Sequence, residues 1–458
     1  MWMPATFRNK RIIEKRVGWT RAQVLAYQQQ RFRELLRHVW DNSPFYHDFY
    51  ADHGIHEADL DHLTVRDLPI VSKEVLMEGF DRISNDEALR RDALEAWIHS
   101  DTKGIYRNRY VVLHTSGSSG NLGIFVYDKE AWTRIRGVTT RGAKLRINPF
   151  NRIRLAWYGA SHGRFAGVTS CRTLPRLFCN RLLCSVLDPF SKTVEELNRF
   201  QPEFIFGYAA AVHELAEAAL AGKLNIRPEF VGTSGEVLTE TAAASIESAW
   251  GVKPTNAYGT SESLCLGLQL NGQNFITLME DENLIEILDE KNEPVAPGEV
   301  GRVVVTALYN RAMPIARYDL RDFVTRGHRA EGAQFDNILG VRGRVEESLP
   351  VTLDDGSVDS IHPVVLSEFF VPGIRRFQFV GESPGRVILR YVADSDIDVA
   401  VSEAFGDILE MKGARGRTEV ALNRVNELPA DPATGKYRLV LVPGSPTAEP
   451  LREPAAVC

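Results

Sequence analysis

The sequence predicts an α/β protein with a large N-terminal body built from several sheets and a small, mobile C-terminal lid of β-β-α-β order. Two patterns lead to this class. Through the middle of the chain, apolar strand-like runs alternate with helical stretches, which is typical of helices packed on a largely parallel sheet. Beyond about residue 343, strand-like runs flank one helix within a short stretch of chain, which indicates a separate compact unit.

Length and composition agree with this division. The chain has 458 residues, enough for two or three domains, and its 44% hydrophobic and 25% charged residues are ordinary for a globular protein. We expect a main domain over 1–342 with a β-rich subdomain from about 284 to 342, a lid domain over 343–445, and a disordered tail over 446–458.

Charge and cysteine usage exclude several classes of protein. The formal net charge of −6, without a local Lys/Arg-rich run, offers no attraction to nucleic acid. The five cysteines form no CxxC pair, and Cys179 and Cys184 have no partners at metal-ligand spacing, so a disulfide framework or metal site is disfavoured. The opening is too charged for a signal peptide, and no apolar run is long enough to span a bilayer. We therefore expect a cytoplasmic protein that binds neither nucleic acid nor membrane.

The N-terminal third predicts a docking helix and a ligand loop. In RFRELLRHVW, residues 31–40, the apolar side chains share one helical face, and DNSPFY should end the helix. RYVVLH and IFVY predict two strands joined by HTSGSSGNLG, residues 114–123. Three glycines and four hydroxyl side chains in this loop suit phosphate oxygens, although a surface turn fits the loop equally well on its own. No Gly-Lys-Ser/Thr follows, so a P-loop NTPase is disfavoured.

The later elements follow in order. The runs IRLAWYG, EFIFGY and EFVGTSG predict strands, and helices follow the last two at 210–222 and 240–250. LIEILDE and RVVVTAL predict paired strands in the β-rich subdomain. The lid elements are RRFQFVG, RVILRYV, a helix, TEVALNRV and YRLVLV.

Several loop motifs together resemble the adenylate-forming superfamily, and within it the branch of phenylacetate-CoA ligases and capsular-polysaccharide-ligase-like proteins. The motifs, in chain order, are NSPFY, LPIVSKEVL, HTSGSSGNLG, FGYAAAVHELA, GTSGEVLT, AYGTSES, LMEDENLIEILDE with PVAPGEVGRVVVTAL, PIARYDLRD, GVRGR and TGKYR. They cover nearly the whole chain in the family's order.

The resemblance implies a role for each matching residue. The phosphate loop for the β- and γ-phosphates of ATP would be Thr115, Ser116, Gly117, Ser118, Ser119 and Gly120. The adenine pocket would be lined by Ser234, Gly235, Glu236, Ala257, Tyr258, Gly259 and Thr260, with Asp322 on the ribose and Arg344 near the domain junction. Glu262 would help to hold Mg²⁺, and Lys436 would bridge the carboxylate and the α-phosphate during catalysis. The acid pocket would include Tyr158, His162, Gly163, Gly207 and Tyr208.

The implied reaction is ATP-dependent activation of a carboxylic acid as an acyl-adenylate, with release of pyrophosphate. Aromatic walls with glycine spaces suit an aromatic or arylalkanoic acid. The leading interpretation passes the acyl group to CoA. Two alternatives stay open: transfer to an amine, and a catalytically retired homologue that binds nucleotide without turnover. A homodimer is common among related enzymes.

Each assignment has a simpler alternative in the residue itself. Glu262 fits a solvated acid at a helix start, Asp322 an acid in a turn, and Arg344 and Lys436 a surface arginine and a loop lysine. A structural role suits His162 as well as contact with the substrate does. The chain also departs from the superfamily after the phosphate loop, where most members carry a lysine and this sequence has Leu122, Gly123 and Ile124. The named branch also often lacks that lysine.

Overall fold

The structure is a computed structural model that describes residues 3–100, 102, 104–115, 122–141, 152–161, 163–270, 273–341, 348–362, 365–366, 369, 371–428 and 439–442. The chain forms two compact units. The first consists of the described residues within 1–115, 123–184 and 194–343, and the second of those within 116–122, 185–193 and 344–458.

The first unit begins with three helices, α1 (Met3–Glu14), α2 (Arg21–Asn42) and α3 (Pro44–Asp52). The predicted docking helix is the second half of α2, and its apolar face is buried as expected: Phe32, Leu35, Leu36 and Val39. Thr20 and Gln23 form a capping box that satisfies backbone donors at its start. Ser43 ends α2 and caps α3, so the predicted stop at DNSPFY is confirmed.

Short helical turns connect these helices to the first hairpin. They are η1 (Glu57–Asp59), η2 (Val65–Asp67), α4 (Lys73–Glu78), η3 (Phe80–Arg82), η4 (Glu87–Leu89) and α5 (Arg91–Ile98). Strands β1 (Val111–His114) and β2 (Ile124–Tyr127) then pair antiparallel. The predicted pair of strands around the Gly/Ser loop is therefore confirmed.

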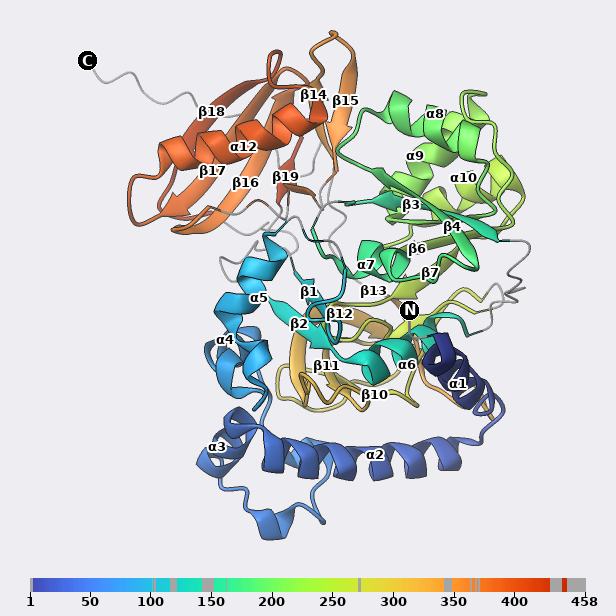
Figure 1. The fold of residues 1–458 in the computed structure, drawn as a ribbon, viewed down its shortest axis with the longest axis vertical. Coiled ribbons are helices and arrows are strands. Elements are labelled where there is room, and N and C mark those ends of the chain that lie inside the picture. Colours follow the sequence, from blue (N-terminus) through green and yellow to red (C-terminus); the bar gives the residue numbers. More distant parts are fainter. Residues whose placement is uncertain are drawn as a thin grey trace. The chain divides into compact units, whose positions relative to one another are not determined.

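An eleven-stranded sheet forms the centre of the first unit, in the order β10-β11-β12-β13-β9-β8-β7-β6-β5-β3-β4 (Figure 1). One part contains β3 (Ile153–Gly159), β4 (Cys179–Ser185), β5 (Phe204–Gly207), β6 (Phe230–Ser234) and β7 (Thr255–Tyr258). The other contains β8 (Gly267–Leu268), β9 (Ile276–Leu278), β10 (Asn283–Leu288), β11 (Val300–Ala307), β12 (Tyr318–Arg326) and β13 (Asn337–Val341). Accompanying helices are α6 (Lys129–Thr139), α7 (Ala166–Arg172), α9 (Ala209–Leu220) and α10 (Glu240–Trp250), together with α8 (Phe190–Phe200), whose first four residues are assigned to the second unit.

The strand pairing matches the sequence pattern. Strands β3, β5, β6 and β7 run parallel, and the crossovers from β5 to β6 and from β6 to β7 carry α9 and α10, so the predicted alternation of strand and helix is confirmed. LIEILDE and RVVVTAL form the antiparallel pair β10–β11, again as predicted.

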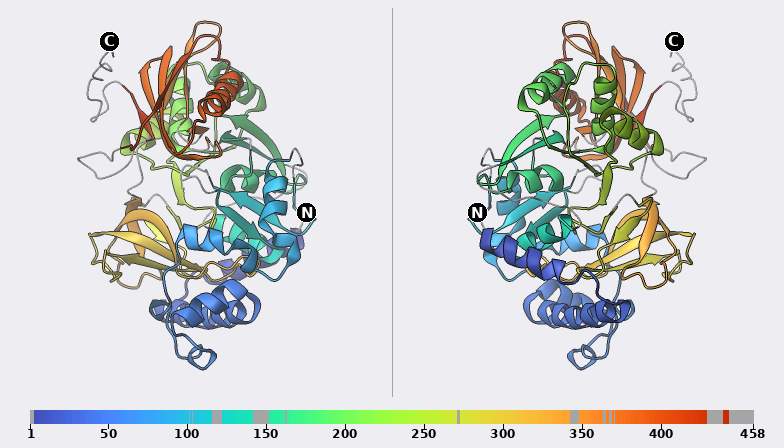
Figure 2. Two further views of the ribbon diagram at one scale, coloured as in Figure 1. Left: turned by 90° about the vertical axis from the view of Figure 1, so that its left-hand side faces the viewer. Right: turned by 90° about the vertical axis from the view of Figure 1, so that its right-hand side faces the viewer.

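A buried ion-pair network fastens the N-terminal helices to the antiparallel part of this sheet. The carboxylates of Asp281 and Glu282 are fully buried, and Arg16 contacts both of them. Arg141 Nη2 lies 2.6 Å from Asp281 Oδ2, and Arg134 Nε lies 2.6 Å from Glu282 Oε2. Figure 2 shows α2, in blue, below the yellow strands of this part of the sheet. Asp281 and Glu282, two acids of LMEDENLIEILDE, thus connect distant segments of the first unit.

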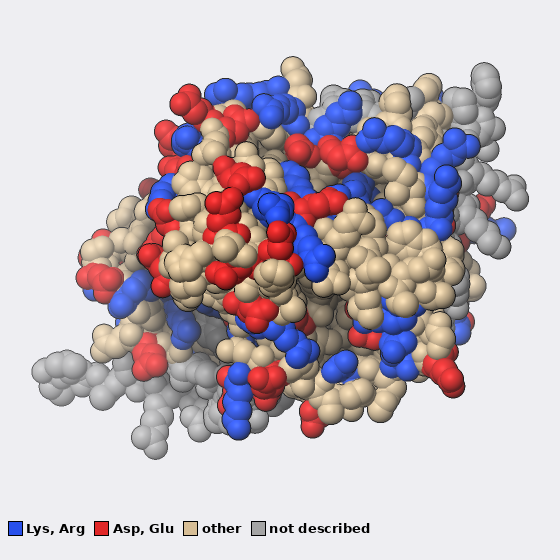
Figure 3. All heavy atoms as spheres, turned by 90° about the horizontal axis from the view of Figure 1, so that it is seen from below, with Lys and Arg blue, Asp and Glu red and all other residues tan. Residues whose placement is uncertain are grey.

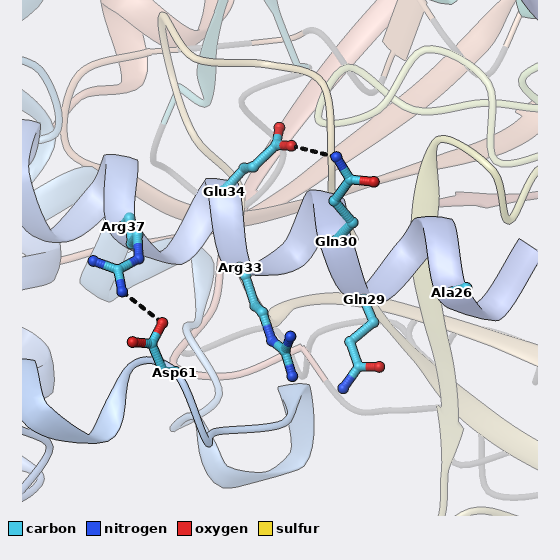
Figure 4. A pocket seen from close by; sticks show the side chains of 7 residues that line it. All are labelled: Ala26, Gln29, Gln30, Arg33, Glu34, Arg37 and Asp61. Atoms are coloured by element: carbon cyan, nitrogen blue, oxygen red, sulfur yellow. Dashed lines mark hydrogen bonds and ion pairs between the residues drawn. The ribbon is translucent and has the colours of Figure 1, made fainter.

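A groove of about 370 Å³ lies along the exposed face of α2. Its lining residues are Ala26, Gln29, Gln30, Arg33, Glu34, Arg37 and Asp61 (Figure 4). Arg37 donates a hydrogen bond to Asp61 across it, and both side chains are more than half exposed. On the face seen from below, acidic and basic side chains are interspersed (Figure 3). These exposed contacts contribute little to stability, because water screens them.

The second unit contains the hairpin β14 (Leu349–Thr352)–β15 (Val358–Ile361) and a four-stranded sheet in the order β18-β17-β16-β19. Its elements are β16 (Ile374–Ser383), β17 (Arg386–Ala393), α12 (Asp398–Lys412), β18 (Glu419–Arg424) and β19 (Val440–Leu441). Phe377, Phe379 and Phe405 pack in its core. The β-β-α-β order is the predicted one, whereas the β14–β15 hairpin was not foreseen, because its two strands are only four residues each.

The predicted α/β fold class is confirmed. Mobility of the lid stays a prediction, and the predicted tail 446–458 lies outside the described residues. Among the described residues, no helix combines the length and the apolarity needed to cross a membrane.

Candidate active site

Thr115 and Gly123 close the base of the predicted phosphate loop where it joins the β1–β2 hairpin, and we call this pair of residues the neck. Thr115 N donates to Gly123 O at 2.9 Å, and Gly123 N donates to Thr115 Oγ1 at 3.2 Å. A Cβ on Gly123 would lie 2.6 Å from Thr115 Oγ1, so a larger residue there would force the Thr115 side chain to move. Ser116, Gly117, Ser118, Ser119 and Gly120 lie outside the described residues. The hairpin therefore fixes where the loop starts and ends.

Glu262 lies in a tight turn that is held against this neck. Thr260 Oγ1 accepts a hydrogen bond from Ser263 N at 3.1 Å, which closes the turn around Glu262. Tyr127 OH, from β2, donates to Ser261 O at 2.7 Å, and Ser261 Oγ donates to His114 O at 3.4 Å. The turn that follows β7 is thereby fastened to both strands of the hairpin.

The Glu262 carboxyl is buried, with only 9% of the residue exposed. Tyr318 OH donates to its Oε1 at 3.4 Å. Burial raises the pKa of Glu262, the nearby Asp322 adds to the rise, and hydrogen bonding from Thr260 and the charge of Lys73 oppose it. A buried carboxyl in this state would be stabilised as an anion by a bound cation.

A bulge in β12 directs Asp322 toward the same region. Val304 pairs with Asp319 and Arg302 pairs with Phe323, so three residues of β12 lie opposite one residue of β11. Arg321, inside the bulge, adopts φ 58°. Tyr258 OH, at the end of β7, donates to Asp322 Oδ2 at 2.8 Å. The bulge therefore points a carboxylate across the sheet to the end of β7.

The two predicted adenine segments lie side by side. Ser234 of β6 pairs with Ala257 of β7, so both segments leave the same edge of the parallel sheet, where such folds bind ligands. Gly235 adopts φ +81°, which favours glycine. The carboxylate of Glu236 accepts a hydrogen bond from Ala210 N at 2.9 Å, so its side chain caps the start of α9.

The predicted acid-pocket residues come from the next two strands. Tyr158 pairs with Gly207, and the ring of Tyr208 lies 5.6 Å from that of Trp157. Tyr158 is buried, and its hydroxyl donates to Glu214 Oε2 of α9 at 3.3 Å. Gly163 adopts φ +58°, where a Cβ would lie 2.9 Å from His114 Nε2. The loop carrying Gly163 thus contacts the strand that leads into the phosphate loop.

Three further predicted residues, His162, Arg344 and Lys436, lie outside the described residues. The structure gathers Thr115, Tyr258, Glu262 and Asp322 within the first unit. A residue not singled out in the sequence joins them: the Cε of Lys73 lies 3.2 Å from the position that a Cβ on Gly123 would occupy. Periodicity and spacing carry no signal for this lysine, because a contact between distant segments brings it here.

Comparisons with known proteins show which sequences and folds this chain is similar to. No family model matches the chain. The phenylacetate-coenzyme A ligase of Escherichia coli is 27% identical over 315 residues, covering 65% of this chain and 66% of the relative. That of Pseudomonas putida is 26% identical over 342 residues, covering 70% and 71%. Protein CapK of Staphylococcus aureus is 21% identical over 401 residues, covering 81% and 79%. The predicted resemblance to the phenylacetate-CoA ligase and CapK branch is confirmed.

Solved structures of adenylate-forming ligases share the fold. A 2-hydroxyisobutyryl-CoA ligase, solved with 2-HIB-AMP and CoA, superposes with a TM-score of 0.60 at 20% identity and covers 93% of this chain and 91% of that chain. At this identity the likeness concerns the fold, including a second, C-terminal unit.

The buried carboxyl of Glu262 suits a magnesium ion carried with a nucleotide. Within the described residues, no group of three or more His, Cys, Asp or Glu side chains could hold a metal. Mg²⁺ is commonly bound by one or two carboxylates together with substrate phosphates and water, and the buried Glu262 provides one carboxylate.

Gly259→Ala tests whether the turn around Glu262 must keep its shape. A Cβ at Gly259 would lie 2.3 Å from Leu264 O, so the turn has to shift. We expect kcat/KM for ATP to fall by at least about tenfold, or about 1.4 kcal/mol. Gly340→Ala is the control, because a Cβ there meets nothing within 4 Å. Equal kinetics for the two variants would contradict the assignment of this turn to the nucleotide site.

Proposed function

We propose that this chain is an ATP-dependent, AMP-forming ligase that activates a carboxylic acid as an acyl-adenylate and then transfers the acyl group to CoA. One observation carries the proposal: the buried carboxyl of Glu262 lies against the neck of the Gly/Ser loop, and Asp322 and Tyr258 lie beside it. The names of the relatives support the same chemistry, since several are phenylacetate-CoA ligases.

In the first half-reaction, a carboxylate oxygen attacks the α-phosphorus of ATP, the bond to the β-phosphate bridge breaks, and pyrophosphate leaves with its electron pair. Both reactants are anions, so catalysis depends on positioning and charge neutralisation. We assign the phosphates to the loop that starts at Thr115, the ribose to Asp322, and Mg²⁺ to Glu262. Lys436 bridges the carboxylate and the α-phosphate, and Arg344 contacts the nucleotide near the domain junction.

In the second half-reaction, the CoA thiolate attacks the acyl carbon and AMP leaves. The acid pocket is assigned to the loop ends of β3 and β5, with Gly163, Gly207, Tyr208 and the ring of Tyr158 as walls and His162 at its edge. This composition favours an aromatic or arylalkanoic acid. Transfer to an amine remains the second outcome to test, and a homodimer and a cytoplasmic location remain predictions from the sequence.

The deciding experiment measures acid-dependent release of pyrophosphate and AMP from ATP. The panel should contain aromatic, arylalkanoic, hydroxy and fatty acids, each with CoA, with amino acids or with no acceptor. Thioester formation with one acid and CoA is the expected result. A product formed only with an amine would replace CoA as the acceptor. ATP binding without pyrophosphate release for any acid would contradict the proposal and favour a retired homologue.

Asp322→Ala tests the ribose assignment. The wild-type protein should discriminate against 2′,3′-dideoxy-ATP, because a carboxylate accepts hydrogen bonds from both ribose hydroxyls. We expect this discrimination to shrink by about tenfold in Asp322→Ala, whereas Tyr258→Phe, which removes only the donor to Asp322, should retain most of it. Steady-state kinetics with the two nucleotides measure the effect. Unchanged discrimination in Asp322→Ala would show that the ribose is bound elsewhere.

A further inference from the structure

The phosphate loop of this chain lacks a basic residue where most of the superfamily has one. Leu122, Gly123 and Ile124 follow the loop, and none of them can neutralise a phosphate. ATP brings several negative charges to this neck, and pyrophosphate leaves with them. The described residues that close the neck, Thr115 and Gly123, are uncharged. A positive charge from another segment would be needed in addition to Mg²⁺.

We propose that Lys73 supplies this charge and binds the β- and γ-phosphates of ATP as the pyrophosphate leaving group forms. The inference rests on the proposed function and names a residue that the sequence analysis did not assign. The position of the side chain supports this role. A Cβ placed on Gly123 would lie 3.2 Å from Lys73 Cε and 2.6 Å from Thr115 Oγ1. The lysine stem therefore lies beside Gly123, which closes the loop with Thr115.

The segment that carries Lys73 is anchored to the strand that carries Asp322. Val71 N donates to Arg317 O at 2.9 Å, and Asp319 N donates to Val71 O at 2.9 Å. Ser72 then caps α4, and Lys73 is the first residue of that helix. Arg317 adopts φ 46° while its side chain donates to the carbonyls of Arg66 and Leu68. These contacts fix the start of α4, and with it the origin of the lysine side chain, against the bulged strand β12.

The charges around Lys73 agree with a phosphate-binding role. The acids within range are Glu262 and Glu74, and the cations are Arg321 and Arg91. Glu74 pairs with Arg321, so these two largely neutralise each other. The charge of Glu262, the proposed Mg²⁺ ligand, acts on Lys73, and the Lys73 stem lies beside Gly123 at the end of the loop. A compact ammonium on a flexible stem can contact oxygens of two phosphates and follow them as the bond breaks.

The test compares Lys73→Met and Lys73→Arg with Lys291→Met, a matched control at an exposed lysine in the turn between β10 and β11. With the acid found for the wild type, we expect Lys73→Met to lower kcat/KM for ATP by about 10²- to 10³-fold. Lys73→Arg should recover part of the loss, because it keeps the charge, and Lys291→Met should match the wild type. Inhibition by added pyrophosphate should weaken in Lys73→Met.

Two results would overturn the proposal. One is a value of kcat/KM for ATP in Lys73→Met within threefold of the wild type. The other concerns thioester formation from supplied acyl-adenylate and CoA, a reaction that involves no pyrophosphate. If Lys73→Met lowers the rate of this reaction as much as it lowers kcat/KM for ATP, the variant has a general structural defect. If the wild type releases no pyrophosphate with any acid, the proposed reaction fails by itself. Calorimetry with ATP and Mg²⁺ then decides for Lys73: weaker binding by Lys73→Met than by Lys291→Met supports it, and equal binding refutes it.

Discussion

Glu262→Gln is expected to lower acid-dependent pyrophosphate release by at least about 100-fold, equivalent to about 2.7 kcal/mol, while it raises the melting temperature of the protein without ligands. The loss follows because glutamine keeps the shape of the side chain and removes the charge that Mg²⁺ requires. The gain in melting temperature follows because burial raises the pKa of Glu262 in the folded protein above its ordinary value, so that a charged Glu262 is unfavourable there.

The raised pKa of Glu262 makes the stability of the protein depend on pH. A carboxyl with a raised folded pKa contributes stability below its unfolded pKa, and that contribution is lost as the pH rises through the folded pKa. At pH values above the ordinary pKa of a glutamate, Glu262 therefore weakens the fold, and Glu262→Gln lacks this penalty. Thermal unfolding from pH 4 to 8 should show the two proteins diverging as the pH rises.

Adding Mg²⁺ with ATP should reduce the difference in melting temperature between the wild type and Glu262→Gln, because the ion stabilises only the wild-type carboxylate. Glu240→Gln, at the exposed start of α10, is the control and should change neither stability nor turnover. A Glu262→Gln variant that is less stable than the wild type, or that retains metal-dependent turnover, would contradict the assigned role.

Asp281→Asn should produce the largest loss of stability. The Asp281 side chain is fully buried, and Arg141 and Arg16 both contact it. Removing one charge of a buried pair leaves its partners uncompensated, which typically costs about 3–5 kcal/mol. Denaturant unfolding of the first unit measures this loss as a lower midpoint.

The effect of pH on this variant has the opposite sign from that on Glu262→Gln. Burial acts to raise the pKa of Asp281, but Arg141 and Arg16 outweigh it and hold that pKa below its ordinary value. The stability it contributes is present above its unfolded pKa and is lost as the pH falls through the folded pKa. The difference between wild type and Asp281→Asn should therefore narrow in acid.

Arg37→Ala is the matched control for the ion pairs of this unit. Its partner Asp61 lies across the groove on α2, and both side chains are more than half exposed (Figure 4). Water screens such a pair, so the denaturation midpoint should not move. A comparable loss in Arg37→Ala and Asp281→Asn would show that burial does not decide the strength of these contacts.

Local sequence rules were sufficient for most of the secondary structure. The apolar face of α2, its end at Ser43, and the strand–helix alternation from β5 to α10 depend on neighbours within a few residues of each other, so the periodicity predicts them. The β14–β15 hairpin has strands too short for a clear periodic signal, and it was missed.

Some parts of the candidate site are likewise predictable from local sequence, and others depend on distant contacts. The loop after β1 and the turn around Glu262 are recognisable from their own residue order, because glycines and hydroxyl side chains close them locally. The direction in which Asp322 points depends on the bulge opposite β11, and the position of Lys73 depends on the bridge from Val71 to β12. Neither contact can be predicted from the periodicity of the sequence.

The fold class, the order of the elements and the motifs at the ends of the parallel strands are therefore predictable from the chain alone. The tertiary contacts add that Asp281 and Glu282 are buried against distant arginines, and that Lys73 lies beside Gly123 at the end of the phosphate loop. Helix capping and apolar periodicity involve residues close together in the sequence, whereas the partners of these buried or half-buried charges come from segments far apart in the chain.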